Sequence, residues 1–133
     1  YIFGGYGGTY YDDLWYLNVN DLNKILKWNK INKQIISPNK RIGCTLNYYN
    51  NKLYLFGGYN KDDKYFNDLW EYNINQNKWN KININNITPN KGAGQKTVIY
   101  KNYLIIFGGC KYREYFNDLY MINLNEYKSY KIN

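Results

Sequence analysis

Few residues in this chain could do chemistry. Its 133 residues include no histidine, so the usual metal ligand, the usual activator of Ser and Cys nucleophiles and the commonest acid–base group are missing. The two cysteines, Cys44 and Cys110, do not have the close spacing of metal-binding pairs. Two thiols are also a weak basis for a disulfide framework, which indicates a reducing, intracellular compartment, and we expect the cytoplasm. We expect no enzyme activity, no cofactor and no metal site in this segment.

Three aspartates are the remaining candidates for a carboxylate or metal site. Asp13, Asp68 and Asp118 each precede Leu and an aromatic residue. A catalytic acid is needed only once, whereas these aspartates recur along the chain. We therefore predict a structural role, in which each carboxylate bonds backbone N–H groups at a turn or at the start of a strand.

The aspartates belong to an internal repeat of about fifty residues. Each copy has an apolar residue, Phe and two glycines, and the glycine pairs are Gly4 and Gly5, Gly57 and Gly58, and Gly108 and Gly109. Each copy then has an aromatic pair before its Asp: Tyr10-Tyr11, Tyr65-Phe66 and Tyr115-Phe116. Trp28 and Trp79 mark a later point in the first two copies. Several markers in one register are hard to obtain from biased composition alone.

Each period contains four short strand patterns and no helical pattern. Two apolar runs come first, and a two-residue turn joins them: Asn50-Asn51 in one copy and Lys101-Asn102 in the next. These turns predict hairpins in which Asn adopts a positive φ. After the double glycine, a third segment alternates apolar and mixed residues, and a fourth surrounds the Trp. In the first copy the turn between the third and fourth segments carries a four-residue insertion.

These motifs resemble the kelch repeat, in which a double glycine closes the second strand and spaced aromatic residues follow. The form of the repeat with Asp-Leu-Trp in its third strand is similar to that of kelch adaptor proteins and kelch-containing phosphatases. The resemblance implies an all-β fold, a partial β-propeller of four-stranded antiparallel blades. We expect about three blades: residues 1–37 (strands B–D, lacking strand A), 38–88 (strands A–D) and 89–133 (strands A–D). Because a propeller closes with about four to eight blades, we expect them to belong to one larger propeller, and we rank a six-bladed ring of two copies below it.

The family also implies a Pro-x-x-Arg-x-x-His pattern where strand A begins. The first occurrence keeps Pro38 and Arg41 but has Cys44 in place of the His. The second keeps Pro89 but has Gly92 in place of the Arg and Gln95 in place of the His. Any role of the arginine is therefore confined to one blade.

The repeated residues have simple structural interpretations. The glycine pairs are not followed by a phosphate-binding motif, so we predict positive φ and close backbone approach at the strand end. Trp28 and Trp79 resemble ligand-stacking platforms, but their fixed place in the blade favours packing between blades. We also interpret the aromatic pairs as mainly structural.

Function is expected where the copies differ. The loops between strands B and C lie on the same rim as the connections between blades, and this rim commonly binds partners in proteins the chain resembles. The loops are mildly basic and rich in Tyr, and Tyr and Arg are frequent hot-spot residues. The predicted partner-binding residues are Tyr6, Lys40, Arg41, Tyr59, Lys61, Lys64, Lys91, Lys111, Tyr112 and Arg113.

The favoured function is a non-catalytic protein-interaction scaffold whose rim binds a partner protein or an acidic peptide. The alternative is the propeller part of an enzyme, similar to galactose oxidase or a kelch phosphatase, whose catalytic residues lie outside this segment. The net charge of +8 favours acidic partners, but scattered lysines make nucleic acid the least favoured. Uncovered apolar blade faces predict self-association, and no apolar run is long enough to span a membrane.

Overall fold

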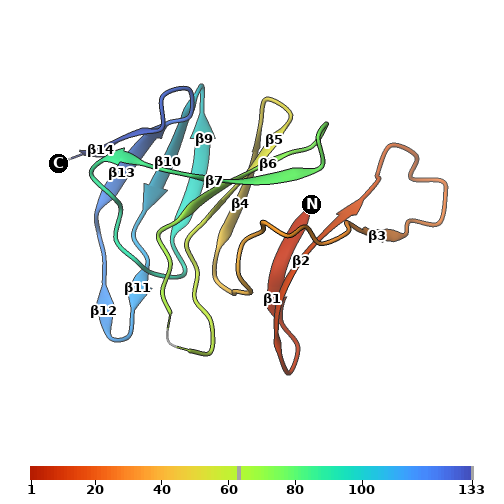
Figure 1. Cartoon of the computed structure of the whole chain (residues 1–133), viewed down its shortest axis with the longest axis horizontal. Helices are drawn as coiled ribbons and strands as arrows, with labels where there is room; N and C mark the ends of the chain where they lie inside the picture. Colours follow the sequence, from red (N-terminus) through yellow and green to blue (C-terminus); the bar gives the residue numbers. More distant parts are fainter. Residues whose placement is uncertain (63, 133) are drawn as a thin grey trace.

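The computed structural model describes residues 1–62 and 64–132, which form strands and connecting loops without a helix. Three sheets of three to five strands stand side by side and follow one another along the chain, and all their strand pairs but one, in the third sheet, are antiparallel (Figure 1). Within the described part of the chain, no helix is long and apolar enough to cross a membrane. The prediction of an all-β, propeller-like arrangement of blades is confirmed.

The first two sheets have the predicted strand content. Blade 1 has the order β1-β2-β3 and no fourth strand, as expected. Its strands are β1 (Ile2–Tyr6), β2 (Tyr10–Leu17) and β3 (Trp28–Lys30). Blade 2 has four strands in sequential order: β4 (Thr45–Tyr49), β5 (Lys52–Phe56), β6 (Leu69–Asn73) and β7 (Lys78–Ile82).

Blade 3 has one strand more than its sequence predicts. Its order is β8-β14-β13-β10-β9. The strands are β8 (Asn85–Asn86), β9 (Lys96–Tyr100), β10 (Tyr103–Phe107), β13 (Leu119–Asn123) and β14 (Lys128–Ile132). A separate hairpin, β11 (Cys110–Lys111) and β12 (Glu114–Tyr115), occupies the loop after the double glycine.

The added strand β8 lies parallel to β14. In blade 2 the fourth strand places Trp79 opposite Tyr72, whereas in blade 3 the small Ser129 stands opposite Ile122. The Ser129 hydroxyl donates a hydrogen bond to the carbonyl of Ile87. The small residue thus allows the chain leaving blade 2 to lie along the edge of blade 3.

The predicted hairpin turns form, with one difference in detail. Asn50 and Asn51 both have positive φ, at 48° and 60°, as expected for a two-residue hairpin. In blade 3 the residue with positive φ is Lys101, at 56°, and Asn102 instead donates its side-chain amide to Asn123.

The double glycines confirm the prediction of positive φ and close approach. Gly4, Gly57 and Gly108 have φ between 66° and 68°, and the following glycines lie between 95° and 115°. A Cβ on Gly4 would lie 2.5 Å from the carbonyl oxygen of Arg41. The second glycine, Gly5, donates its N–H to that same carbonyl. The motif therefore fastens the end of one blade to the chain that enters the next.

The core lies between blades. One cluster joins blades 1 and 2 through Leu14, Leu53, Leu55, Trp70, Tyr72 and Trp79, and the other joins blades 2 and 3 through residues such as Phe56, Leu69, Leu104 and Ile122. Trp79 is 4% exposed and its ring contacts Phe3 of blade 1 edge-on. Trp28, predicted to pack in the same way, is 49% exposed, because no blade of this chain covers that face of blade 1.

Candidate functional site

Five tyrosines form a continuous row across the rim of all three blades. Successive ring centroids are 5.1 Å (Tyr6–Tyr10), 6.2 Å (Tyr10–Tyr59), 5.5 Å (Tyr59–Tyr65) and 5.1 Å (Tyr65–Tyr112) apart. We call this set the tyrosine row. It contains the three predicted rim tyrosines and two members of the aromatic pairs, Tyr10 and Tyr65, which the sequence interpretation treated as structural.

Backbone bridges hold the middle of the row in place. Tyr59 exchanges two hydrogen bonds with Ile42, both 2.9 Å long, and also forms a bridge with Tyr65. Tyr112 lies at the tip of the β11–β12 hairpin, and its N–H donates to the Tyr65 hydroxyl at 3.2 Å. The row is therefore set on paired backbone rather than on free loops.

Tyr112 adopts an unusual backbone conformation. Its φ is +54°, in the left-handed region that a bulky residue seldom occupies. Its side chain is exposed, while its N–H bonds the Tyr65 hydroxyl. A positive φ is what the two-residue turn of the β11–β12 hairpin requires, as at Lys101 in the β9–β10 hairpin.

A basic hollow lies at the blade 3 end of the row. It has a volume of about 450 Å³ and is lined by Lys64, Tyr65, Phe66, Lys91, Lys111 and Tyr112. We call it the lysine hollow. Its three lysines come from the B–C loop of blade 2, the connection into blade 3 and strand β11. Chain segments distant in sequence thus bring three positive charges together beside the tyrosine row.

None of these lysines is neutralised by a residue that the structure describes. The ion pairs found within residues 1–62 and 64–132 all involve other cations. Lys111 lies 5.7 Å from the centre of the Tyr112 ring. Lys64 and Lys91 are exposed, whereas Lys111 is half-buried.

The other predicted rim residues are dispersed. Tyr6, Lys61 and Arg113 are exposed, and Lys40 is half-buried. None of these four lines the lysine hollow. The structure therefore brings together Lys64, Lys91, Lys111 and Tyr112 at one hollow, and Lys40, Lys61 and Arg113 lie outside it.

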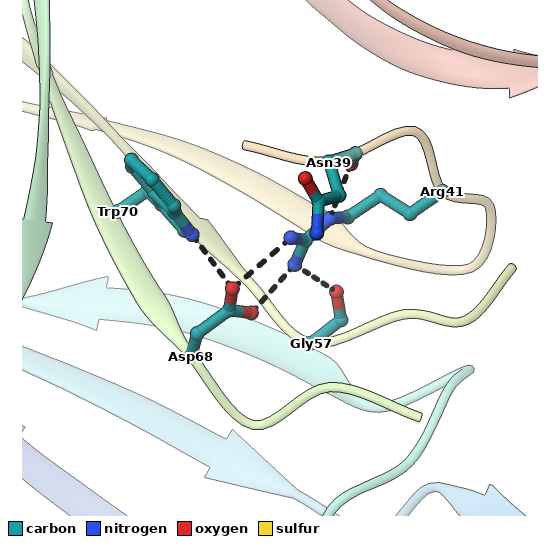
Figure 2. A network of polar contacts seen from close by, with 5 residues as sticks. All are labelled: Asn39, Arg41, Gly57, Asp68 and Trp70. Atoms are coloured by element: carbon teal, nitrogen blue, oxygen red, sulfur yellow. Dashed lines mark hydrogen bonds and ion pairs between the residues drawn. The ribbon is translucent and has the colours of Figure 1, made fainter. Parts of the chain in front are cut away.

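Arg41 is the clear error among the predicted rim residues. Its side chain is 0% exposed. The guanidinium donates to both carboxylate oxygens of Asp68, at 2.6 and 3.0 Å, and to the carbonyls of Gly57 and Asn39 (Figure 2). It also lies over the Phe66 ring, 4.0 Å from the ring centre. A planar cation with five donors suits such a buried site, so Arg41 is structural and cannot touch a partner.

The repeated aspartates bond mainly side chains, and Asp13 also accepts a bond from its own backbone N–H, the kind of donor that was predicted. Asp68 accepts a bond from the Trp70 indole at 2.7 Å as well as those from Arg41. Asp13 accepts bonds from the Trp15 indole at 2.8 Å and from Lys30 at 3.1 Å. The contact of Asp13 with Lys30 ties β2 to β3 in blade 1. The contact of Asp68 with Arg41 ties the start of β6 to the segment before β4 in blade 2.

Blade 3 replaces the missing arginine by other donors. Asp118 accepts bonds from the Asn90 amide at 2.8 Å and from Lys131 at 2.6 Å. The hydrogen bond from Lys131 lowers the pKa of Asp118. Burial alone would raise the pKa of Asp13, but the bonds from Trp15 and Lys30 outweigh it and lower that pKa.

The candidate site offers docking chemistry. Among residues 1–62 and 64–132, no three His, Cys, Asp or Glu side chains gather as metal ligands. Both cysteines are free and partly buried, and burial raises the pKa of the Cys44 thiol, which makes its reactive thiolate scarce. The tyrosine row and the lysine hollow present phenol, ammonium and ring surface, which bind acidic and aromatic groups.

Comparison with known proteins agrees with the blade geometry. A family model described as the KLHDC2/KLHL20/DRC7 Kelch-repeats domain matches residues 1–133. Kelch domain-containing protein 2 of Bos taurus is 31% identical over 112 residues, which are 83% of this chain and 27% of that protein. Kelch domain-containing protein 3 of Rattus norvegicus is 26% identical over 119 residues, 82% of this chain and 31% of that protein.

A much longer protein also matches part of this chain. Dynein heavy chain-like protein 2 of Plasmodium falciparum (isolate 3D7) is 34% identical over 98 residues, which are 73% of this chain and 2% of that protein. The chain thus spans less than a third of the length of each of these three relatives.

Proposed function

This chain belongs to the KLHDC2/KLHL20/DRC7 kelch-repeat family, and from that premise we propose that it is part of a non-catalytic scaffold that binds a partner protein through its rim. The observation that supports the proposal most directly is the tyrosine row, which crosses three blades without interruption. Aromatic rings on paired backbone provide large contact area at little entropic cost. We further propose that the protein works in a reducing compartment, which its free cysteines favour.

An extended acidic segment is the partner that this surface suits best. Tyrosine hydroxyls can donate to carboxylates and backbone carbonyls, while the rings cover apolar stems. Lys64, Lys91 and Lys111 supply positive charge at one end of the row. At the opposite end, the loop that follows Tyr6, residues 7–9, carries no charged residue. We propose that acidic residues of the partner lie toward blade 3.

The test replaces the hairpin tip. In the full-length protein, Tyr112→Ala combined with Arg113→Ala should abolish pull-down of the native partner, because it removes the exposed ring and its neighbouring cation. The expected loss is at least tenfold, in the range of hot-spot residues at about 2 kcal/mol or more. Melting temperature should stay within about 2 °C, since both side chains are exposed.

Tyr48→Ala combined with Lys78→Ala is the matched control. It also removes an exposed tyrosine and an exposed cation, but from β4 and β7, outside the rim loops. The control should retain the partner fully. Equal retention by the Tyr112 and Arg113 variant would contradict the rim assignment.

A further inference from the structure

The lysine hollow gathers Lys64, Lys91 and Lys111 on one concave surface. These lysines differ from those that form ion pairs with carboxylates: Lys24 with Asp21, Lys30 with Asp13, Lys33 with Asp12, Lys52 with Glu71 and Lys131 with Asp118. In the hollow, three lysines share one concavity with three aromatic residues. Glu114 stands opposite Lys111 in the β11–β12 hairpin, but it neither lines the hollow nor forms an ion pair with Lys111 in the described structure.

The hollow suits a dianion better than a single carboxylate. Three ammonium groups held in one concavity repel one another, and a bound anion relieves that repulsion in proportion to its charge. A carboxylate contributes one negative charge, whereas a phosphate monoester carries about −1.5 to −2 at pH 7 and three acceptor oxygens. Lysine is a compact point charge without the planar fork of arginine, and it binds phosphate well.

We propose that the lysine hollow binds the phosphorylated side chain of a partner peptide, with Lys64, Lys91 and Lys111 as its ligands. This inference depends on the proposed function, because the rest of the peptide would lie along the tyrosine row. Tyr65 and Tyr112 belong to both surfaces, so a peptide on the row would deliver one side chain into the hollow. A volume of about 450 Å³ exceeds what a phosphoryl group on a short side chain needs.

A peptide fits these observations better than a nucleic acid or a lipid surface. Backbone recognition of nucleic acid uses a stripe of cations that follows successive phosphates. Here the cations converge on one hollow, and the row that leads away from it consists of tyrosines. The geometry therefore provides one cluster of cations with a row of tyrosines beside it.

The experiment measures binding of the full-length protein to degenerate Glu-rich peptides whose fixed central residue is Ser, phosphoserine or Glu. We expect the phosphoserine pool to bind about tenfold more tightly than the Ser pool, as charge-assisted bonds require. Lys91→Gln combined with Lys111→Gln should abolish that preference: affinity for the Glu-rich Ser pool should also fall, because these lysines attract its carboxylates, but affinity for the phosphoserine pool should fall about tenfold further. Lys78→Gln, an exposed lysine on β7, is the control and should keep the preference.

The outcomes separate this inference from the proposed function. If the three pools bind equally, the phosphoryl site is overturned. If Tyr59→Ala then abolishes that binding, the proposed rim scaffold still stands. Binding of no pool, together with partner pull-down that survives the Tyr112 and Arg113 variant, would overturn both. Tighter binding to single-stranded RNA or to phosphoinositide vesicles than to the phosphoserine pool, with the same dependence on Lys91 and Lys111, would also overturn the peptide assignment.

Discussion

At the scale of single residues, Arg41 shows how one residue can join two blades, through its side chain to blade 2 and through its backbone to blade 1. It enters from the connection between blades 1 and 2, and its donors reach Asp68 and the carbonyl of Gly57 at 3.0 Å. Its own backbone carbonyl accepts from Gly5 of blade 1. Buried charges are stable only when they are paired and hydrogen-bonded, and every contact of Arg41 meets that condition.

Removing the guanidinium should therefore be costly. Arg41→Met keeps much of the stem but leaves the Asp68 carboxylate without its main cation, which typically costs about 3–5 kcal/mol. We expect a fall of about 3 kcal/mol in the free energy of unfolding of the full-length protein, measured by urea denaturation. Arg113→Met, at an exposed position, should change it by less than about 0.5 kcal/mol. Equal stability of the two variants would contradict the structural role.

The burial of Arg41 could not be read from the sequence. It follows Lys40 in a basic, polar loop, which is the composition of an exposed rim. Its partners, Gly57, Phe66 and Asp68, approach it only in the folded blade. The structural role of the aspartates was predictable, because recurrence is visible in the sequence, but the predominance of side-chain donors over backbone N–H groups was not.

At the scale of elements, a buried carboxylate fastens blade 2 to blade 3. Glu71 on β6 is almost fully buried. One of its oxygens accepts bonds from Tyr127 at 2.6 Å, Lys52 at 3.0 Å and Tyr54 at 3.1 Å. Tyr127 comes from the turn between β13 and β14, so this bond crosses between blades. The corresponding third-strand residues in blades 1 and 3 are Tyr16 and Met121, so this contact is specific to one interface.

This contact predicts an alkaline loss of stability. Burial raises the pKa of Tyr54 and of Tyr127, and the Glu71 carboxylate raises both further. A pKa raised in the folded state means that the stabilisation is complete below the unfolded value of about 10 and is lost as pH rises above it. We expect the urea midpoint of the full-length protein to fall between pH 9 and pH 11.

The variant Tyr127→Phe tests the origin of that loss. Without its hydroxyl the protein should be less stable at pH 8 by about 1 kcal/mol, yet lose less stability from pH 9 to pH 11 than the wild type. Tyr100→Phe, on the exposed side of β9, should follow the wild type at every pH. An unchanged pH slope in Tyr127→Phe would show that Tyr127 does not contribute to the alkaline loss.

Strands and hairpins were largely predictable, and their exceptions have physical reasons. Alternating apolar residues, glycine pairs and two-residue turns are local signals, and the strands they predict form in all three copies. Strand β8 was missed because Asn85 and Asn86 have no apolar alternation. It forms by pairing with β14, and the Ser129 hydroxyl bonds the Ile87 carbonyl beside it. The tyrosine row was predicted only in part. Tyr10 and Tyr65 recur as Tyr115 in the third copy, so their recurrence indicated a structural role, yet Tyr10 and Tyr65 lie in the row and Tyr115 does not.

At the scale of the whole molecule, the two end faces are complementary. Phe56 on blade 2 is covered by blade 3 and is 0% exposed, whereas the corresponding Phe107 on blade 3 is 52% exposed. Trp79 on blade 2 packs against blade 1, whereas the corresponding Trp28 on blade 1 is exposed. The outer face of blade 3 therefore resembles the face that receives a following blade. The outer face of blade 1 resembles the face that packs on a preceding one.

We propose that the 133-residue chain, expressed by itself, associates head to tail through these faces. Burying one large aromatic or aliphatic side chain contributes about 1.5–3 kcal/mol, and a heterologous contact either closes into a ring or grows into a chain. Sedimentation velocity should detect species larger than the monomer, and Phe107→Ser or Trp28→Ser alone should abolish them. Ile25→Ser, at an exposed position in the β2–β3 loop, should leave association unchanged.

Mixing the two disabled variants gives the sharper test of direction. The Trp28→Ser chain keeps an intact blade 3 face and the Phe107→Ser chain keeps an intact blade 1 face, so each mixed pair retains one complete interface. Because their other faces are impaired, growth should stop at a dimer that neither variant forms alone. A single monomeric species for the unmodified chain would contradict the proposal. A mixture that stays monomeric would show that association, where it occurs, is not head to tail.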